Sequence, residues 1–162
     1  MYRAQIGGWL SGPPTTPLAP GEHKGSRLGL PPSGPGAVAG LGRRVVALIV
    51  DWILALLIGR LVAPGVDYPS DGSSLVTLGV FFVMVTLLTW VGGGSIGHRL
   101  LGMCVIRVGG GGAGPVRALV RTALLCLVIP AVFWDRDGRG LHDQAAGTVL
   151  VLTRQPSRSP RV

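Results

Sequence analysis

A long apolar run begins at Arg43-Arg44-Val-Val-Ala-Leu-Ile-Val-Asp51-Trp52 and continues as Ile-Leu-Ala-Leu-Leu-Ile-Gly59-Arg60-Leu-Val62. Positions 44–62 comprise nineteen residues, which form an α-helix roughly 28 Å long at the usual rise per residue. The hydrocarbon core of a bilayer is about 30 Å thick. A buried helix of a soluble protein could hold the same run, but such helices are usually shorter and amphipathic. We therefore predict a transmembrane helix.

Asp51 is the anomaly in this helix, because an ionised carboxylate near the bilayer centre costs about 2.5–3.5 kcal/mol on insertion scales. It belongs to a stripe of small or polar residues that recur every four positions: Ala47, Asp51, Ala55 and Gly59. Residues spaced in this way share one face of a helix. Small residues let a neighbouring helix approach closely, so we expect the stripe to be the packing face.

The composition of the chain also favours a membrane protein. It has 162 residues, of which 14% are charged, whereas about a quarter are charged in soluble domains. Its mean hydropathy is +0.51. The net charge of +8 suggests nucleic acid, but the cations lie in loops and tails with few aromatic residues among them. We expect no nucleic-acid partner; a salt-sensitive pull-down of nucleic acid by the isolated tails would reverse that view.

Three regions follow from local composition. Residues 1–36 are rich in proline and glycine and predict a disordered cytoplasmic tail. Residues 37–153 form the expected membrane domain, and 154–162 form a basic cytoplasmic tail. We see no cleavable signal peptide, so the first helix would act as its own insertion signal. Cys104 and Cys126 form no CxxC pair, and we interpret both as small apolar residues in a reducing compartment.

A second apolar run, 75–91, comprises seventeen residues and would span about 26 Å as a helix. Trp90 near its end is suited to an interfacial anchor. The glycines at 92, 94 and 97 match a GxGxxG pattern, but a dinucleotide site requires a preceding strand. We therefore reject that match and expect the glycines to let the chain turn at the membrane surface.

Two short β-branched runs, 103–108 and 148–153, predict strands that pair as a cytoplasmic ribbon. Alternation along a strand would put Cys104, Ile106 and Val108 on one face.

The segment 117–134 lies between these strands. Its uncharged part, 122–134, would be only about 20 Å long as a helix, and Pro130 interrupts it. That length suits a re-entrant or interfacial segment. If the segment does not cross, fourteen of the fifteen Lys and Arg residues lie on one side and only Arg60 lies on the other, as the positive-inside rule favours.

The expected fold is thus an all-α membrane protein. It has two transmembrane helices, a short re-entrant or interfacial third helix and a small two-stranded cytoplasmic β-ribbon, with both termini in the cytoplasm.

The sequence offers no catalytic constellation. Asp135-Arg-Asp137-Gly138 resembles the start of a calcium loop, but its twelfth position is Ala146 rather than glutamate. His98 and His142 do not have metal-ligand spacing. We therefore expect no enzyme activity, no metal and no cofactor.

Polar residues near the membrane need partners, namely Arg44, Asp51, Arg117, Arg121 and Asp143. Helical side chains lean toward the N-terminus, so we expect Arg44 to reach the headgroups, away from Asp51. Arg121 on the third segment is then the better partner of Asp51, with Thr86 as an added hydrogen-bond donor. Such a buried pair can be a proton or ion site, or a latch that fixes helix packing.

Three motifs together resemble the RDD family of bacterial membrane proteins. Gly42-Arg-Arg44 with Asp51-Trp52 resembles its first helix, Ser95-Ile-Gly-His-Arg-Leu-Leu-Gly-Met-Cys-Val105 its post-helix segment, and Leu141-His-Asp143-Gln-Ala-Ala-Gly147 its closing motif. The Arg and two Asp for which the family is named correspond to Arg44, Asp51 and Asp143. The segment between Arg121 and His142 is shorter than in many members, and the long N-terminal tail is similar to the actinobacterial branch.

The resemblance implies a multi-pass protein of the inner (plasma) membrane, from a family whose biochemistry is mostly unassigned and for which transport has been proposed in some members. Two spans are too few to enclose a pathway, so transport would require oligomerisation or a partner. We therefore expect a homo-oligomer or a membrane-protein partner in the lipid bilayer, and a protein that acts with partners or in a transport assembly. The alternative is a homo-oligomeric ion or proton transporter in which Asp51 titrates.

Overall fold

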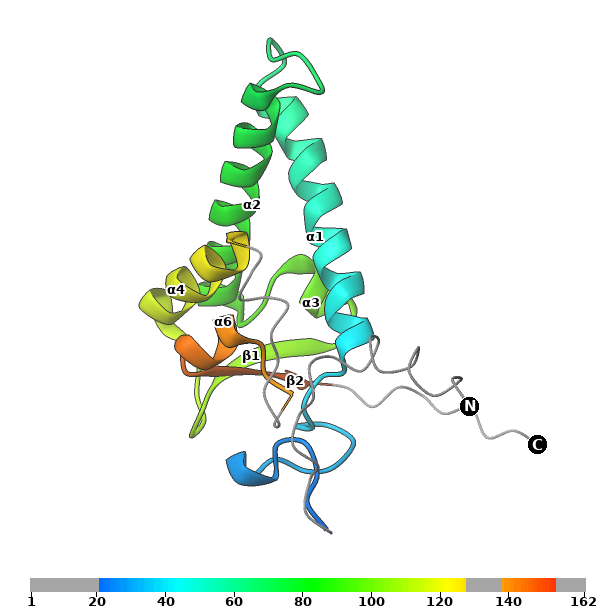
Figure 1. Ribbon diagram of the computed structural model, residues 1–162, viewed down its shortest axis with the longest axis vertical. Coiled ribbons are helices and arrows are strands. Elements are labelled where there is room, and N and C mark those ends of the chain that lie inside the picture. The colour runs from blue at the N-terminus through cyan, green and yellow to red at the C-terminus, as the bar shows by residue number, and fades with distance from the viewer. Residues whose placement is uncertain (1–20, 128–137, 154–162) are drawn as a thin grey trace, which may run out of the picture.

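Two long helices dominate the computed structural model, which describes residues 21–127 and 138–153. Helices α1 (Leu41–Val62) and α2 (Asp71–Gly92) form an antiparallel hairpin. They lie close together near the loop that joins them and separate toward the other end, where the shorter elements lie (Figure 1). Both helices are long and apolar enough to cross a membrane, as the two apolar runs predict.

The second helix begins four residues earlier than the apolar run, because a polar turn precedes that run. Ser70 caps it by accepting a hydrogen bond from the backbone N–H of Ser73, and the Ser73 hydroxyl oxygen accepts one from the backbone N–H of Ser70. This reciprocal capping box satisfies two backbone donors at the helix start. The helix ends at Gly93, whose φ of 69° is left-handed and reverses the chain direction.

The separated end of the hairpin holds the remaining elements in chain order: α3 (Ile96–Leu100), β1 (Met103–Arg107), α4 (Gly114–Cys126), α6 (Leu141–Ala145) and β2 (Thr148–Leu152). The strands are antiparallel, with Met103 opposite Leu152 and Arg107 opposite Thr148. The predicted pairing of the two strands is therefore confirmed, with each strand one residue shorter than expected, and its register is now known.

Alternation along β1 is also as predicted. Met103 and Val105 are buried, whereas Cys104 and Ile106 face the other way and are half-buried. The other edge of β2 is not free, because the backbone of residues 36–39 pairs with it. The N–H of Ala39 donates to the carbonyl of Leu150, and the N–H of Leu152 donates to that of Ala37, both at 2.9 Å.

The structure describes residues 21–36 of the N-terminal region, and the disorder expected for residues 1–36 stays a prediction. This segment contains a turn of 3-10 helix, η1 (Ser26–Leu28), which begins and ends at glycines in left-handed conformations. The His23 ring nitrogen Nε2 lies 2.8 Å from the carbonyl of Leu30. Hydrogen-bonded turns thus form in residues 21–36, although the proline- and glycine-rich composition of this segment cannot supply a hydrophobic core. Residues 1–20 and the predicted basic tail at 154–162 lie outside the described residues.

Helix α4 corresponds to the start of the predicted third segment and contains thirteen residues, so it is only about 20 Å long. It packs against α2 (Figure 1). Its buried face carries Ala118, Arg121 and Thr122, while Leu119 and Leu127 are exposed. The rest of the predicted segment, including Pro130, lies outside the described residues.

Helix α1 has the same arrangement, with polar and small residues inside and large apolar residues outside. Its buried residues are Arg44, Ala47, Asp51, Ala55 and Gly59, which confirms the packing stripe. Ile53 and Leu57 are more than half exposed, at 51% and 61%. A soluble helix places these two kinds of residue the other way round.

Candidate functional site

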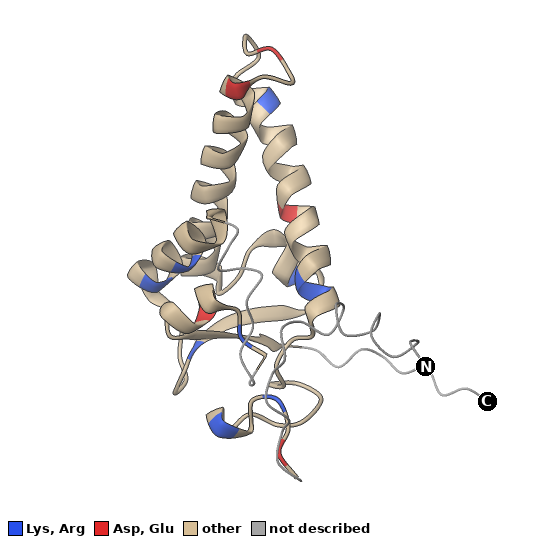
Figure 2. Ribbon diagram, viewed as in Figure 1, with Lys and Arg blue, Asp and Glu red and all other residues tan. Residues whose placement is uncertain are grey.

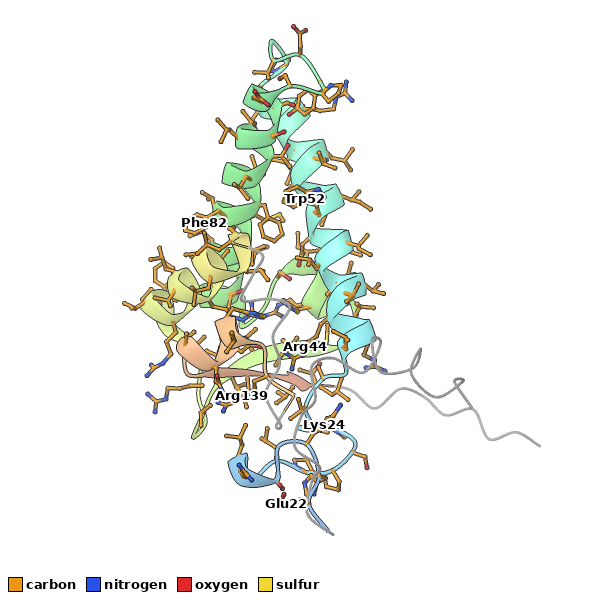
Figure 3. All side chains as sticks on the ribbon, in the orientation of Figure 1. Glu22, Lys24, Arg44, Trp52, Phe82 and Arg139 are labelled. Atoms are coloured by element: carbon orange, nitrogen blue, oxygen red, sulfur yellow. The ribbon has the colours of Figure 1, made fainter. Side chains whose placement is uncertain are left out.

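A buried polar cluster fills the separated end of the helix hairpin. Its members are Arg44 and Asp51 of α1, Ser95 and His98 at α3, Arg121 of α4 and Asp143 of α6, and all six are buried. Figure 3 shows Arg44 at the lower turns of α1, close to the strands. Two arginines and two aspartates give balanced formal charges, so the cluster can be buried without a net charge.

Asp143 is the centre of one half of the cluster. Its carboxylate accepts hydrogen bonds from Arg44 Nη1 at 3.0 Å and from Arg121 Nε at 2.6 Å, and from the Thr148 hydroxyl at 3.2 Å. Burial by itself would raise the pKa of Asp143, but the charges of Arg121, His142 and Arg44 outweigh it and lower that pKa well below its usual range. Asp143 therefore stays ionised and joins α1, α4, α6 and β2.

Arg44 does not reach toward headgroups, so that prediction is wrong. Its side chain leans toward the N-terminus as helical geometry requires, but α6, β2 and the 36–39 segment cover that end of α1. The guanidinium donates to the Ala39 carbonyl at 3.0 Å and to the Leu150 carbonyl at 3.4 Å, besides Asp143. Arg44 thus ties the start of α1 to the sheet.

Asp51 forms the other half of the cluster, with partners that the sequence analysis did not assign. It accepts hydrogen bonds from the Ser95 hydroxyl and, at 2.8 Å, from the backbone N–H of Gly97. Both donors lie in the first turn of α3, where backbone N–H groups are free to bind a carboxylate. Asp51 therefore holds the N-terminus of α3 against the middle of α1.

The predicted hydrogen-bonded contact between Asp51 and Arg121 is absent from the described structure. The two side chains interact through their charges, but Arg121 donates to Asp143 instead. The Thr86 hydroxyl, expected as an added donor to Asp51, has no hydrogen-bond partner among the described residues. The reason is α3, which occupies the space next to Asp51.

Gly97 lies where the backbones of α1 and α3 come close together. A Cβ atom at this position would lie 2.2 Å from the carbonyl oxygen of Ala47, a distance that only glycine avoids. At Ala47 the small-residue stripe of α1 thus packs against the backbone of α3 and not against another long helix.

His98 lies between the two halves. Its Nδ1 is 3.2 Å from the Ser95 backbone nitrogen, which donates to it, and 2.7 Å from Ser95 Oγ. It also interacts electrostatically with Arg121, Asp143, Arg44 and His142. Burial, followed by the charge of Arg121, lowers the pKa of His98 to about 3. The ring is therefore neutral at physiological pH.

A pH dependence of stability follows from His98. An unfolded histidine binds a proton below about pH 6.5, while the folded one stays neutral until about pH 3. The unfolded state then binds more protons, so the stability contributed by neutral His98 is full above pH 6.5 and falls as the pH decreases through this window. The slope is about 1.4 kcal/mol per pH unit in the free energy of unfolding.

Denaturation in detergent at pH 4 to 6 measures this slope. His98→Asn keeps an acceptor near the position of Nδ1 but does not titrate, so it should remove about one proton from the slope. An unchanged slope in His98→Asn would contradict the assignment.

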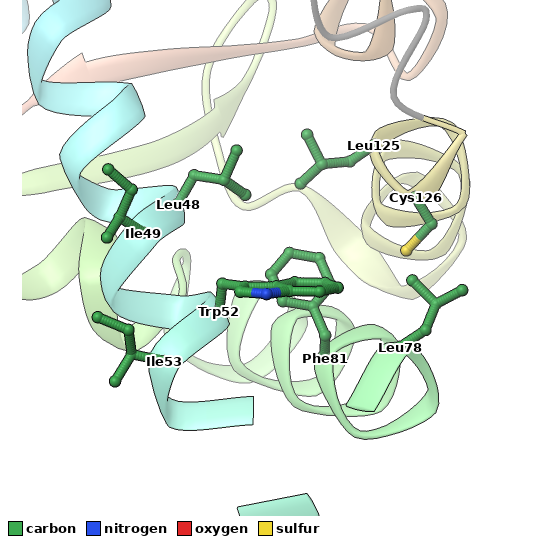
Figure 4. A pocket seen from close by; sticks show the side chains of 8 residues that line it. All are labelled: Leu48, Ile49, Trp52, Ile53, Leu78, Phe81, Leu125 and Cys126. Atoms are coloured by element: carbon green, nitrogen blue, oxygen red, sulfur yellow. The ribbon is translucent and has the colours of Figure 1, made fainter. Parts of the chain in front are cut away.

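An apolar hollow of about 320 Å³ lies next to the cluster, between α1, α2 and α4. Figure 4 shows Trp52 and Phe81 together in its wall, with ring centroids 5.4 Å apart. Its other lining residues are Leu48, Ile49, Ile53, Leu78, Leu125 and Cys126. None of these side chains carries a charge, so the hollow suits hydrocarbon and not a polar substrate.

The structure brings all but one of the candidate charged residues into the buried cluster. Arg44, Arg121 and Asp143 come together, Asp51 lies beside them with Ser95 and Gly97, and Arg117 is exposed at the start of α4. Sequence reasoning missed the roles of Ser95, Gly97 and His98, although Ser95 and His98 have the three-residue spacing of a capping box. In the part of the chain that the structure describes, no group of His, Cys, Asp and Glu could hold a metal ion.

Comparison with known proteins agrees with the motifs. No curated protein and no solved structure matches the chain. The model of the RDD family matches residues 38–147, a range that contains the whole buried polar cluster. The tail that resembles the actinobacterial branch lies outside the match, so that assignment stays a prediction. The match covers well over half of the chain, and the protein belongs to the RDD family.

Proposed function

We propose that the protein is an integral protein of the plasma membrane whose helices α1 and α2 cross the bilayer. The observation that supports this most is the inverted distribution of residues, with the buried polar cluster inside and leucine, isoleucine and valine outside. Water would penalise such a surface, whereas hydrocarbon accommodates it. The charges agree: Lys and Arg gather at the sheet end, while the other end carries Arg60 with two aspartates (Figure 2). The sheet and both termini are therefore cytoplasmic.

In this arrangement α4 lies along the cytoplasmic side of the bilayer without crossing it. The buried polar cluster acts as a latch: its hydrogen bonds and ion pairs hold α3, α4 and α6 at the separated end of the hairpin. The two spans formed by the described residues enclose no pathway by themselves, and we infer that the protein works with a membrane-protein partner or as a homo-oligomer, within a transport assembly and not as an enzyme. Its rigid cytoplasmic end would keep the two spans at a fixed separation for that partner.

Cysteine labelling in intact cells tests this topology, in a background where Cys104 and Cys126 are replaced by serine. A membrane-impermeant maleimide should label Asp67→Cys from outside. It should label Arg27→Cys and Arg158→Cys only after the membrane is permeabilised. Labelling of position 158 in intact cells would overturn the proposal.

A second candidate is a homo-oligomeric proton or ion transporter with Asp51 as the titrating group. The observation that favours it is the chain Asp51–Ser95–His98, in which Ser95 Oγ contacts both other side chains. Proton flux in reconstituted vesicles that disappears in Asp51→Asn, while the folded yield is unchanged, would replace the latch by this function. Equal flux in both proteins, or none in either, would exclude it.

A further inference from the structure

Three exposed or half-exposed arginines stand on three different elements at the sheet end of the hairpin. Arg43 lies in the first turn of α1, Arg99 in α3 and Arg117 in the first turn of α4. All three lie outside the buried polar cluster, and none of them takes part in the latch. Arg99 and Arg117 are exposed and Arg43 is half-buried.

Each of these arginines has a large exposed apolar residue beside it. Arg99 precedes Leu100 and Arg117 follows Val116; these two apolar side chains are each 71% exposed. Near Arg43, Leu41 is 44% exposed. At a bilayer boundary the pairing is expected, because the apolar side chain enters the hydrocarbon and the arginine reaches the headgroups.

The guanidinium of Arg99 is also tied to the end of a span. Its Nη2 donates to the carbonyl of Gly92, the last residue of α2. Arg43 lies correspondingly at the start of α1. The two arginines therefore mark the same end of both proposed transmembrane helices, and α4, which packs on α2, brings Arg117 to this end.

We propose that Arg43, Arg99 and Arg117 form an arginine belt that binds the headgroups of anionic phospholipids in the cytoplasmic leaflet. Guanidinium groups bind phosphate with two parallel hydrogen bonds, and basic residues next to a membrane are attracted to its anionic lipids. The opposite end of the hairpin lacks this character, because Arg60 stacks on the Tyr68 ring at 4.9 Å and is accompanied by Asp67 and Asp71. The arginine belt would thus bind anionic lipids at the sheet end of the hairpin and not at the end that carries Arg60. This inference rests on the proposed membrane location.

Competitive lipid binding tests the belt on the purified full-length protein. Native mass spectrometry with equal amounts of phosphatidylglycerol and phosphatidylcholine of the same chains gives the ratio of bound lipids. Each arginine should contribute about five-fold to the preference for the anionic lipid. We expect a clear preference in the wild type and almost none in Arg43→Gln/Arg99→Gln/Arg117→Gln. Glycerol phosphate added in excess should not compete, which distinguishes a lipid from free phosphate.

Two further variants make the result specific. Arg60→Gln is the matched control at the other end and should keep the wild-type preference. Replacement of the three arginines by lysine should keep most of the preference for the anionic lipid. That result would show that the glutamine variant loses the preference through lost charge and not through misfolding. A triple glutamine variant that keeps the preference, or an Arg60→Gln variant that loses it equally, would overturn the belt. If labelling confirms both spans but no preference is found, only the belt fails; if the labelling topology fails, the proposed function fails first.

Discussion

Asp143→Asn should be the most damaging single substitution in the cluster, with a loss of about 3–5 kcal/mol in the free energy of unfolding. The amide keeps the shape of the side chain but removes the charge that compensates Arg44 and Arg121, which lie 3.0 and 2.6 Å from the carboxylate. Folded domains are stable by only about 5–15 kcal/mol. Reversible denaturation of the protein in detergent, or its folded yield, measures the loss.

Two comparisons make this prediction specific. Asp67→Asn removes an exposed carboxylate in the loop between α1 and α2 and should change stability by less than about 0.5 kcal/mol. The double variant Asp143→Asn/Arg121→Gln should recover part of the loss, because one buried charge is removed together with its partner. If the two single substitutions simply add in the double variant, Arg121 and Asp143 are not coupled and the latch is wrong.

Gly97→Ala should separate α3 from α1 and cost at least about 2 kcal/mol. The new methyl group would lie 2.2 Å from the Ala47 carbonyl oxygen, which is fixed in the middle of a helix and cannot rotate away. The Asp51 hydrogen bond to the Gly97 N–H would be strained by the same shift. Thermal denaturation in detergent gives the effect as a decrease of the midpoint temperature.

The matched control is Gly79→Ala in α2, where a Cβ atom meets nothing within 4 Å. There the substitution should stabilise the protein by about 0.5–1 kcal/mol, since alanine favours a helix more than glycine does. A neutral Gly97→Ala would show that α1 and α3 do not pack as closely as described.

Elements defined by their own residues could be predicted from the sequence. The lengths of the apolar runs gave the two long helices, the repeat at Ala47, Asp51, Ala55 and Gly59 gave the buried face of α1, and β-branched runs gave the two strands. Each of these signals depends on periodicity within one segment.

Partners of the charged residues could not be predicted in the same way. Asp51 and Arg121 were each expected to need an opposite charge, but the partner of a buried group depends on which segments meet in space. The missing piece was α3, a five-residue helix too short to produce a periodic signal. The backbone N–H of Gly97 and the hydroxyl of Ser95 stabilise the Asp51 carboxylate by hydrogen bonds, which a search for opposite charges does not find.

The partners of Arg44 could not be predicted from the sequence either. The direction of its side chain was predicted correctly from helix geometry, but its destination was not. The pairing of residues 36–39 with β2 and the position of α6 close that end of α1, so the guanidinium meets carbonyl groups and Asp143 where headgroups were expected.

Measuring how deep the exposed apolar residues of α1 and α2 lie in a bilayer tests whether these two helices cross it. Spin labels at Ile53 of α1, Val83 of α2 and Arg107 of β1, in a background without Cys104 and Cys126, report accessibility to oxygen, which dissolves in hydrocarbon, and to a water-soluble nickel chelate. If α1 and α2 cross the bilayer, positions 53 and 83 should show high oxygen and low nickel accessibility, and position 107 should show the reverse. Nickel accessibility at 53 and 83 as high as at 107 would contradict the proposed spans and, with them, the membrane function.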